Sequence, residues 1–317
     1  KINVIPVYSL MNKSKYKFIN IVKSISIPFH IYKVTNTKSD TRNIIVKQNQ
    51  LLGSWVSIVF KIISKSKLYT RTGYDMFLFS IKEKKPIYKR FLYLMLTQVT
   101  IFFSDYYSVT SFSDFSFLKK RCLATKNMVI RPNWVEKGIH DVKREYHNTL
   151  LAVGRLEKQK NFQNLLYSLI DTGFKLDIYG EGSLKEELIT LSKELGVDLN
   201  IYDNIENDEL LNVYKRYNYF ISSATFEGNS KVILEAMANG CVVIAKDIIN
   251  NREIIENSVS GILYTDNLSE ILVKLKNNKY DNLNLVNNAK NVINDTYSKD
   301  VVFSKYLFDF KKLHERE

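Results

Sequence analysis

Two acids with seven residues between them, Glu227 and Glu235, lie in the stretch FEGNSKVILEAMANG at residues 226–240. Glu235 stands among apolar residues that are typical of a core, whereas Glu227 stands beside a glycine. Burying an unpaired carboxylate is costly, and often shifts its pKa instead. Glu235 is therefore expected either to face solvent, on an amphipathic helix, or to have a partner that the local sequence does not show.

Two cations follow a predicted strand in the same half of the chain. The apolar run TLLAVG ends on Gly154, and it is followed by Arg155 and then by Lys160 at the start of the next predicted helix. Cations at a strand-to-helix turn, together with helix N-terminal amides, can hold a phosphate or diphosphate. Taken alone, the two cations are more often surface charges than ligands.

The residues between the two acids offer a second place for an anion. Gly228, Asn229 and Ser230 lead into a predicted helix, and Asn and Ser are favourable N-cap residues. The glycine allows a ligand to approach the backbone closely, and the helix dipole attracts negative charge. On the simpler interpretation, Glu227 only complements that dipole.

The second half of the chain predicts a parallel α/β sheet, because short apolar runs alternate with segments of helical periodicity. In such sheets ligands bind where strands end and helices begin. Strands are predicted at 149–154, 175–180, 198–203, 219–222 and 241–246, and helices at 160–171, 183–195, 207–217 and after residue 230.

The first half is similar but less regular, so we expect two Rossmann-like, doubly wound α/β domains facing a central cleft. The predicted domains are 1–132, a linker at 133–148, 149–296, and a C-terminal helix at 297–317 that crosses back to the first domain. In the first half, strands are predicted at 2–8, 29–35, 43–48, 67–71, 105–111 and 127–132, and helices at 52–64 and 87–103.

Composition excludes several classes of protein. With 45% apolar and 25% charged residues among 317, a packed globular protein is expected. Two distant cysteines argue against a disulfide framework, and four scattered histidines give no metal-ligand spacing. The longest apolar run, 91–103, is too short to span a bilayer, and the start, KINVIPVYSL, predicts a strand rather than a signal peptide. A cytoplasmic location is expected.

The charge is divided unequally along the chain. Residues 1–150 contain 26 Lys and Arg against 8 Asp and Glu, a net charge of +18, whereas the remainder carries −5. A basic half indicates either a solvated face or docking at an anionic membrane surface. The segment 86–104 mixes cations with aromatic and aliphatic residues, as interfacial helices do, but it is also typical of a core helix. No nucleic-acid-binding signature is present.

In order and at these spacings, the motifs resemble glycosyltransferase family four, a retaining family with the GT-B fold, also described as glycosyl transferases group 1. The resemblance covers roughly residues 126 to 313. It is carried by LLAVGRLEKQKNFQNLLYSL, KLDIYGEGSLKEEL and FEGNSKVILEAMANGCVVIAKDIINNREIIENSVSGILY.

The resemblance implies a role for each of these residues. Arg155 and Lys160, after Gly154, match the pair that holds the donor diphosphate, and Glu235 matches the acid that binds the ribose hydroxyls. Glu227 matches the acid that contacts the donor sugar. The loop after residue 203 would bracket the base. The turn Gly228, Asn229, Ser230 and Lys231 would lie near the sugar and distal phosphate, and Arg71 takes the place of an acceptor-side histidine.

The chain departs from the family pattern in three places. Asn161 replaces a glycine after Lys160, Asn250 and Asn251 replace a Gly-Gly pair, and the first half is shorter than usual, either compact or lacking its start. The glycines of the family allow close backbone approach. The acceptor contacts are therefore the part of the site that the sequence defines least.

The resemblance implies an enzyme that moves a sugar from a nucleotide sugar, expected to be UDP-linked, to a lipid-linked or cell-surface glycan. Lipopolysaccharide, O-antigen and capsule are such bacterial products, and the enzyme would work without metal or cofactor as a peripheral protein on the inner face of the cytoplasmic membrane. The alternatives are a nucleotide-sugar epimerase on the same fold and, on basicity alone, a nucleic-acid-binding protein.

Overall fold

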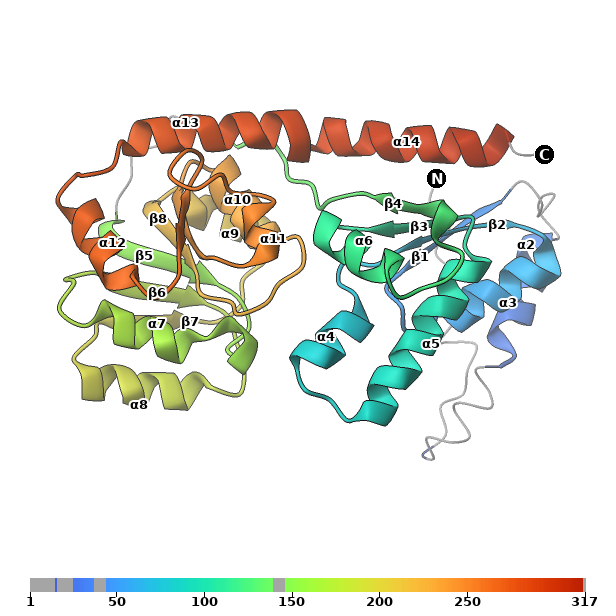
Figure 1. Ribbon diagram of the computed structural model, residues 1–317, viewed down its shortest axis with the longest axis horizontal. Helices are drawn as coiled ribbons and strands as arrows, with labels where there is room; N and C mark the ends of the chain where they lie inside the picture. The colour runs from blue at the N-terminus through green and yellow to red at the C-terminus, as the bar shows by residue number, and fades with distance from the viewer. Residues whose placement is uncertain (1–14, 16–24, 37–43, 139–145, 316–317) are drawn as a thin grey trace. The chain divides into compact units, whose positions relative to one another are not determined.

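The computed structural model describes residues 15, 25–36, 44–138 and 146–315 of the chain (Figure 1). The chain forms two compact units. Unit 1 holds the described residues of Lys1–Val109, Asp114–Ile130 and Leu307–Glu317, and unit 2 holds those of Thr110–Ser113 and Arg131–Tyr306. Asn133 to Gly138, the described start of the predicted linker, thus lie in unit 2. The division at 132, 148 and 296 stays a prediction.

Unit 1 contains a parallel sheet in the order β1-β2-β3-β4. Tyr69 of β2 lies opposite Tyr106 of β3, and Tyr107 lies opposite Met128 of β4. The elements of this unit are α2 (Ile27–Asn36), β1 (Ile45–Asn49), α3 (Ser54–Ser64), β2 (Lys67–Arg71), α4 (Met76–Lys82), α5 (Ile87–Phe103), β3 (Tyr106–Val109), α6 (Phe112–Lys119), the short 3₁₀ turn η3 (Thr125–Asn127) and β4 (Met128–Ile130). The first two residues of α6, Phe112 and Ser113, belong to unit 2.

The sheet of unit 1 is covered on both faces. The crossover helices α3 to α6 lie on one face, and the last turns of α14 (Lys299–Glu315) lie on the other (Figure 1). On the α14 side, the ring of Phe310 lies 5.1 Å from that of Tyr69, whose hydroxyl donates to Asp309 at 3.0 Å. Sequential parallel strands put all crossovers on one side, so the second face needs a helix from elsewhere in the chain.

One predicted strand is a helix. Residues 29–35 were expected to be extended because β-branched and aromatic residues dominate them, but they lie within α2. Pro28 occupies the first turn of α2, where a missing N–H is tolerated, and Ile27, Ile31 and Val34 recur at helical spacing. Packing against α3 decides the conformation over β-propensity. The strand predicted at 2–8 lies outside the described residues.

Unit 2 is a six-stranded parallel sheet in the order β10-β9-β8-β5-β6-β7. The strand order reverses between β5 and β8, which makes the carboxyl ends of these two strands the topological switch point. The strands are β5 (Tyr146–Val153), β6 (Lys175–Tyr179), β7 (Leu199–Tyr202), β8 (Tyr217–Ser222), β9 (Val242–Lys246) and β10 (Ile262–Tyr264).

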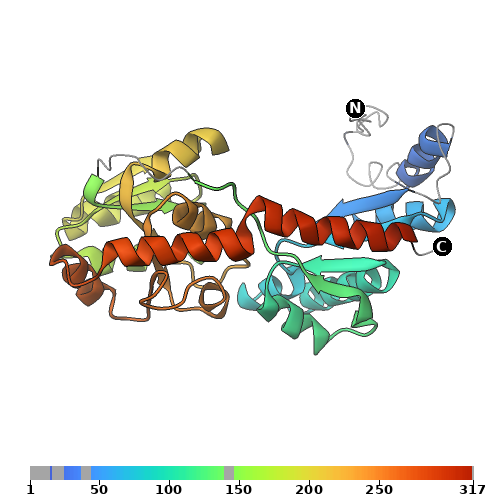
Figure 2. The same cartoon turned by 90° about the horizontal axis from the view of Figure 1, so that it is seen from above.

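Two apolar cores, one on each face of this sheet, hold unit 2 together. One core contains leucines of α7, α8 and α12, and the other contains residues of α9, α10 and α13. Helix α13 runs across the second face (Figure 2). The remaining elements are η4 (Lys158–Lys160), α7 (Phe162–Leu169), α8 (Lys185–Leu195), α9 (Asn207–Tyr214), α10 (Lys231–Ala238), α11 (Ile249–Arg252), α12 (Leu268–Lys276), α13 (Asn282–Val292) and the π-helical turn η5 (Ile293–Tyr297).

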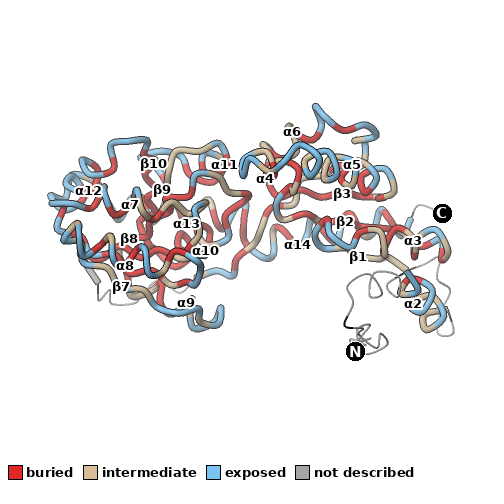
Figure 3. Tube along the Cα trace, turned by 90° about the horizontal axis from the view of Figure 1, so that it is seen from below, coloured by how far each residue is buried: buried red, intermediate tan, exposed pale blue. Residues whose placement is uncertain are grey.

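The central strands are the most deeply buried part of unit 2 (Figure 3). Leu150 and Leu151 of β5 face opposite cores and are both fully buried, as expected for a parallel strand covered on two sides. The strands predicted from 149 to 246 are confirmed. The sequence did not predict β10, α4 or α6, which are short and lack clear periodicity. Among the described residues, no helix is both long and apolar enough to cross a membrane.

Candidate functional site

The loops that follow β5 and β8 are joined by hydrogen bonds at the switch point of unit 2. The Thr225 N–H donates to the Gln159 carbonyl at 3.0 Å, and Gln159 Nε2 donates to the Phe226 carbonyl at 2.8 Å. The Ser223 hydroxyl donates to the Lys160 carbonyl at 2.6 Å. Two strand-end loops therefore form one preorganised surface.

Lys160 and Glu227 meet across these loops. The Lys160 ammonium lies 2.6 Å from Glu227 Oε2, and the two side chains are only 15% and 19% exposed. Gly154 makes room for the lysine, because a Cβ at this position would lie 2.8 Å from Lys160 Cε. The structure thus brings together three of the predicted site residues. The two that form the ion pair are 67 positions apart in the sequence.

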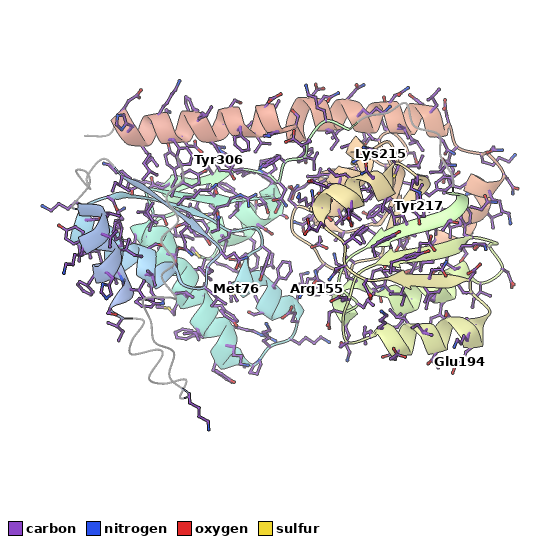
Figure 4. All side chains as sticks on the ribbon, turned by 180° about the vertical axis from the view of Figure 1, so that it is seen from behind. Met76, Arg155, Glu194, Lys215, Tyr217 and Tyr306 are labelled. Atoms are coloured by element: carbon purple, nitrogen blue, oxygen red, sulfur yellow. The ribbon has the colours of Figure 1, made fainter. Side chains whose placement is uncertain are left out.

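Arg155 stands at the end of β5, on the surface of unit 2 (Figure 4). Its backbone neighbours are fixed, because Gly154 N–H donates to the Tyr179 carbonyl at 3.0 Å and Leu156 N–H donates to the Glu181 carbonyl at 2.8 Å. No described residue forms a hydrogen bond or ion pair with its guanidinium. Arg155 therefore presents an open cation on a rigid loop.

The residue after Lys160 explains a departure from the family pattern. Asn161 has φ 58° and precedes α7 as its N-cap. Glycine adopts this left-handed conformation readily, and asparagine is among the few other residues that tolerate it. The change from glycine to asparagine therefore leaves the backbone path of this loop available.

The turn before α10 is buried and held in place. Asn133 N–H donates to Asn229 Oδ1 at 2.8 Å, and Asn133 Nδ2 donates to the Asn229 carbonyl at 2.5 Å. Gly228, Asn229 and Ser230 are all buried. Ser230 is the N-cap of α10, but its side chain makes no capping hydrogen bond. The first N–H groups of α10 thus lack a side-chain cap, which leaves them available to an anion.

Glu235 faces inward and has two partners in the protein. It is 3% exposed, its Oε1 lies 3.1 Å from the Lys231 ammonium, and its Oε2 accepts from the Tyr214 hydroxyl at 3.3 Å. The solvent-facing alternative is therefore wrong. Burial, reinforced by the charge of Glu235, raises the pKa of Tyr214 well above its usual value, so the tyrosine remains a donor.

Sequence reasoning missed Tyr214, Asn133 and Gln159, which hold the predicted residues. Tyr214 ends α9, a different helix from the one that carries Glu235, and Asn133 lies in the stretch expected to be a linker. No local spacing connects them to the site. An asparagine directly after Pro132 and a tyrosine at the end of a helix are both too common in proteins to indicate a functional site.

The two asparagines that replace the family's glycines have structural roles. Asn251 is fully buried and its Nδ2 donates to the Lys246 carbonyl at 2.8 Å, and Asn250 Nδ2 donates to the Ser113 hydroxyl at 2.8 Å. Glu253, after them, accepts from the N–H groups of Phe112 and Ser113, both at 2.7 Å within unit 2. This segment is fixed by side chains that glycines would lack.

A pocket of about 260 Å³ opens beside the start of α7. It adjoins Lys160 in sequence but contains none of the predicted donor residues, so its position gives no independent support to the site. It is lined by Asn161, Asn164, Leu165, Tyr167, Ser168, Lys246, Tyr264, Thr265, Asp266 and Leu268.

Arg71 ends β2 in unit 1, at the carboxyl edge of that sheet, as the sequence predicts. It is half-buried and opposite Asn49. Burial and then the charge of Arg71 lower the pKa of Lys47. In the described ranges, no group of three or more His, Cys, Asp or Glu side chains is placed to hold a metal ion. The acceptor role of Arg71 stays a prediction.

Residues 138–292 match the model of the glycosyl transferases group 1 family. The resemblance to this family that the motifs predict is therefore confirmed over these residues. It is 33% identical over 174 residues to the N-acetylgalactosamine-N,N'-diacetylbacillosaminyl-diphospho-undecaprenol 4-alpha-N-acetylgalactosaminyltransferase of Campylobacter jejuni, an overlap of 51% of this chain and 46% of that protein. The chain spans about half or less of the length of the curated relatives it matches first.

Solved structures show the same fold at low identity. The sucrose-phosphate synthase of Thermosynechococcus elongatus aligns with a TM-score of 0.79 at 14% identity, covering 97% of this chain and 82% of that one. Anabaena HepE in complex with UDP aligns with a TM-score of 0.75 at 13% identity, covering 90% and 82%. The chain therefore has two Rossmann-like α/β domains of the GT-B type, and the predicted fold class is confirmed.

Proposed function

We propose that this chain is a retaining glycosyltransferase that moves a sugar from a UDP-linked donor to a lipid-linked glycan. The observation that carries the proposal is the pair of strand-end loops at the switch point of unit 2. There Lys160 and Glu227 lie 2.6 Å apart beside the open cation of Arg155. The match to the family model supports the same reaction class.

The chemistry requires charge stabilisation rather than a strong base. As the bond between the sugar carbon and the phosphate oxygen breaks, negative charge grows on the diphosphate, and Arg155, Lys160 and the uncapped amides of α10 can stabilise it. The acceptor hydroxyl forms the new bond on the same face and passes its proton to the leaving phosphate. Glu227 positions the sugar and Glu235 the ribose, without a metal or cofactor.

Two comparisons support the substrate classes. The Campylobacter jejuni relative carries a diphospho-undecaprenol acceptor in its name, and HepE was solved with UDP. A lipid-linked acceptor used in lipopolysaccharide, O-antigen or capsule synthesis fits both the relative and the basic first half of the chain. Such an enzyme would work in the cytoplasm, at the inner face of the membrane of a bacterium.

The first test measures how UDP raises the melting temperature of the parent and three variants. A ligand at 100 times its Kd stabilises a protein by about 2.7 kcal/mol. We expect this shift in the parent and in Lys158→Ala, an exposed lysine of the same turn, but not in Lys160→Ala or Arg155→Ala. Repeating the measurement in EDTA tests metal independence.

Three outcomes would contradict the proposal. If UDP and other nucleoside diphosphates stabilise none of the folded proteins, the donor site is wrong. If a nucleotide sugar is converted to its epimer without an acceptor, the chain is an epimerase. Salt-sensitive binding to DNA without any nucleotide response would favour the nucleic-acid alternative instead.

A further inference from the structure

Helix α5 of unit 1 leaves most of its large apolar side chains exposed, unlike an ordinary surface helix. The residues that face the unit include Thr97, Thr100 and Ile101, all buried, and the Thr100 hydroxyl lies 2.9 Å from that of Ser54 on α3. The Thr97 hydroxyl has no hydrogen-bond partner. A surface helix normally buries its apolar stripe and exposes its polar residues. Here two threonines share the inward side with Ile101 and Leu94, while most of the large apolar side chains face outward.

The outward side of α5 is a continuous apolar stripe, which we name the α5 face. Its positions recur three or four residues apart along 17 residues, and its side chains are between 40% and 82% exposed. Exposed apolar surfaces of this extent mark interaction sites. The α5 face consists of Ile87, Tyr88, Phe91, Leu92, Met95, Val99 and Phe102.

Cations without acids surround this face. From Lys84 to Ser104 the sequence contains four cations and no Asp or Glu, and Lys84 and Lys89 are exposed. The acid just before this segment, Glu83, is paired with Lys85 at 2.7 Å. The charge at the start of the stripe is therefore net positive, because four cations there face one acid.

A second segment extends the same pattern. Leu123 is 78% exposed, and it is fixed to α5 by Gln98, which donates to the Leu123 carbonyl at 2.9 Å and accepts from its N–H at 2.6 Å. The residues before it, Lys119 to Arg121, are three consecutive exposed cations. Exposed apolar side chains with nearby cations thus occur both on α5 and in the segment bonded to it.

We propose that the α5 face docks into the surface of an anionic lipid bilayer, with its apolar side chains at the headgroup boundary and the flanking cations on the headgroups. Helix α5 is not long enough to span a membrane, so it would lie in the interface. A second copy of the chain is disfavoured as the occupant, because it would bring the same cations against one another. The inference rests on the proposed function and deepens it by naming where the enzyme meets its lipid partner.

Vesicle sedimentation tests the proposal without any sugar donor. The parent should bind vesicles that contain phosphatidylglycerol and bind pure phosphatidylcholine weakly. We expect Phe91→Gln/Leu92→Gln to lower binding at least about tenfold, since an exposed apolar pair can no longer enter the interface. The matched control, Val273→Gln/Leu283→Gln, replaces two exposed apolar residues of unit 2 and should bind as the parent does.

A second measurement separates insertion from attraction by charge alone. A tryptophan introduced by the substitution Phe91→Trp should shift its emission to the blue and be quenched by brominated lipid. The proposal is overturned if both double variants bind equally, or if the emission of the introduced tryptophan is unchanged on anionic vesicles. It is also overturned if the α5 variant, but not the control, dissociates a dimer of the parent in the absence of lipid. The UDP shift of each variant reports on the donor site, so failure of docking and failure of the proposed transferase remain distinguishable.

Discussion

At the residue scale, Glu235 shows how a carboxylate can be buried on an apolar helix. Lys231 is 52% exposed, so its contact with Glu235 is screened by water and contributes little to stability. Tyr214 is fully buried, and its hydroxyl gives the carboxylate a donor that desolvation does not weaken. The carboxylate is therefore held in place by protein groups before any nucleotide arrives.

Replacing Glu235 with Gln tests the ribose role implied by the family resemblance. If the carboxylate holds a ribose hydroxyl, the parent should bind UDP about tenfold more tightly than 2'-deoxy-UDP, since a hydrogen bond to a charged group is worth roughly 1.5–3 kcal/mol. The variant should lose most of this preference while its melting temperature changes little. Calorimetric titration of both proteins with both nucleotides measures the effect, and equal preference in the two proteins would exclude the role.

At the element scale, the N-cap of α4 is a buried acid, and its ionisation lowers the stability of the folded state. Asp75 is 1% exposed, and its Oδ1 accepts from the Leu78 N–H at 2.6 Å while its Oδ2 has no partner. Burial raises the pKa of Asp75 to about 6, against the lowering effect of the Leu78 and Phe77 N–H groups. Burial, and then the charge of Asp75, raises the pKa of Tyr107 and of Cys122, whose side chains lie near it.

This raised pKa predicts that unit 1 loses stability as the pH rises from about 4 to about 6. In that window the folded state binds a proton that the unfolded state has released, so the free energy of unfolding falls with pH, by about 3 kcal/mol in total for Asp75. Above about pH 6, the contribution of Asp75 to the free energy of unfolding no longer changes with pH.

The variant Asp75→Asn keeps the acceptor for Leu78 and removes the charge. We expect it to be more stable than the parent at pH 8 and to approach it near pH 4. Urea unfolding at pH 4.5, 6 and 8 provides the comparison. Parallel pH profiles for the two proteins would show that Asp75 is not the group responsible.

At the scale of the whole molecule, unit 1 is completed by the end of the chain. The last turns of α14 contribute Asp309, Phe310 and Leu313 to a sheet whose strands lie more than 170 positions earlier. Leu313 is fully buried, and Asp309 accepts from the hydroxyl of Tyr69. Stability of the first unit therefore depends on residues that the sequence places last.

Truncating Leu313 to Ala should destabilise unit 1 by about 2–5 kcal/mol, the usual cost of removing a buried leucine side chain. Unit 2 should keep its response to UDP. Calorimetry should show a lower melting temperature for a transition that UDP does not shift. Leu307→Ala, an exposed leucine of the same helix, serves as the control and should change the melting temperature much less. Equal effects of the two substitutions would contradict the assignment.

For unit 2, the sequence alone predicted the strands β5 to β9 and the sheet edge at which a site is expected, but not β10. Its strands are buried on both faces, so each is a compact apolar run, and the residues that follow must meet at one edge of a parallel sheet. Gly154, Lys160, Glu227 and Glu235 follow from that rule together with the family resemblance. The same reasoning failed at α2, where a β-rich composition is overruled by packing.

Only the tertiary structure decided what these residues touch. The 2.6 Å contact of Lys160 with Glu227, the bond of Tyr214 to Glu235 and the hold of Asn133 on Asn229 join segments that no local periodicity connects. The outward exposure of the apolar side of α5 is also decided only by the tertiary structure. Its sequence fits a core helix, and only the choice of Thr97 and Thr100 as the packed side leaves the α5 face exposed. Side-chain burial depends on which elements meet, and that is set by the whole chain at once.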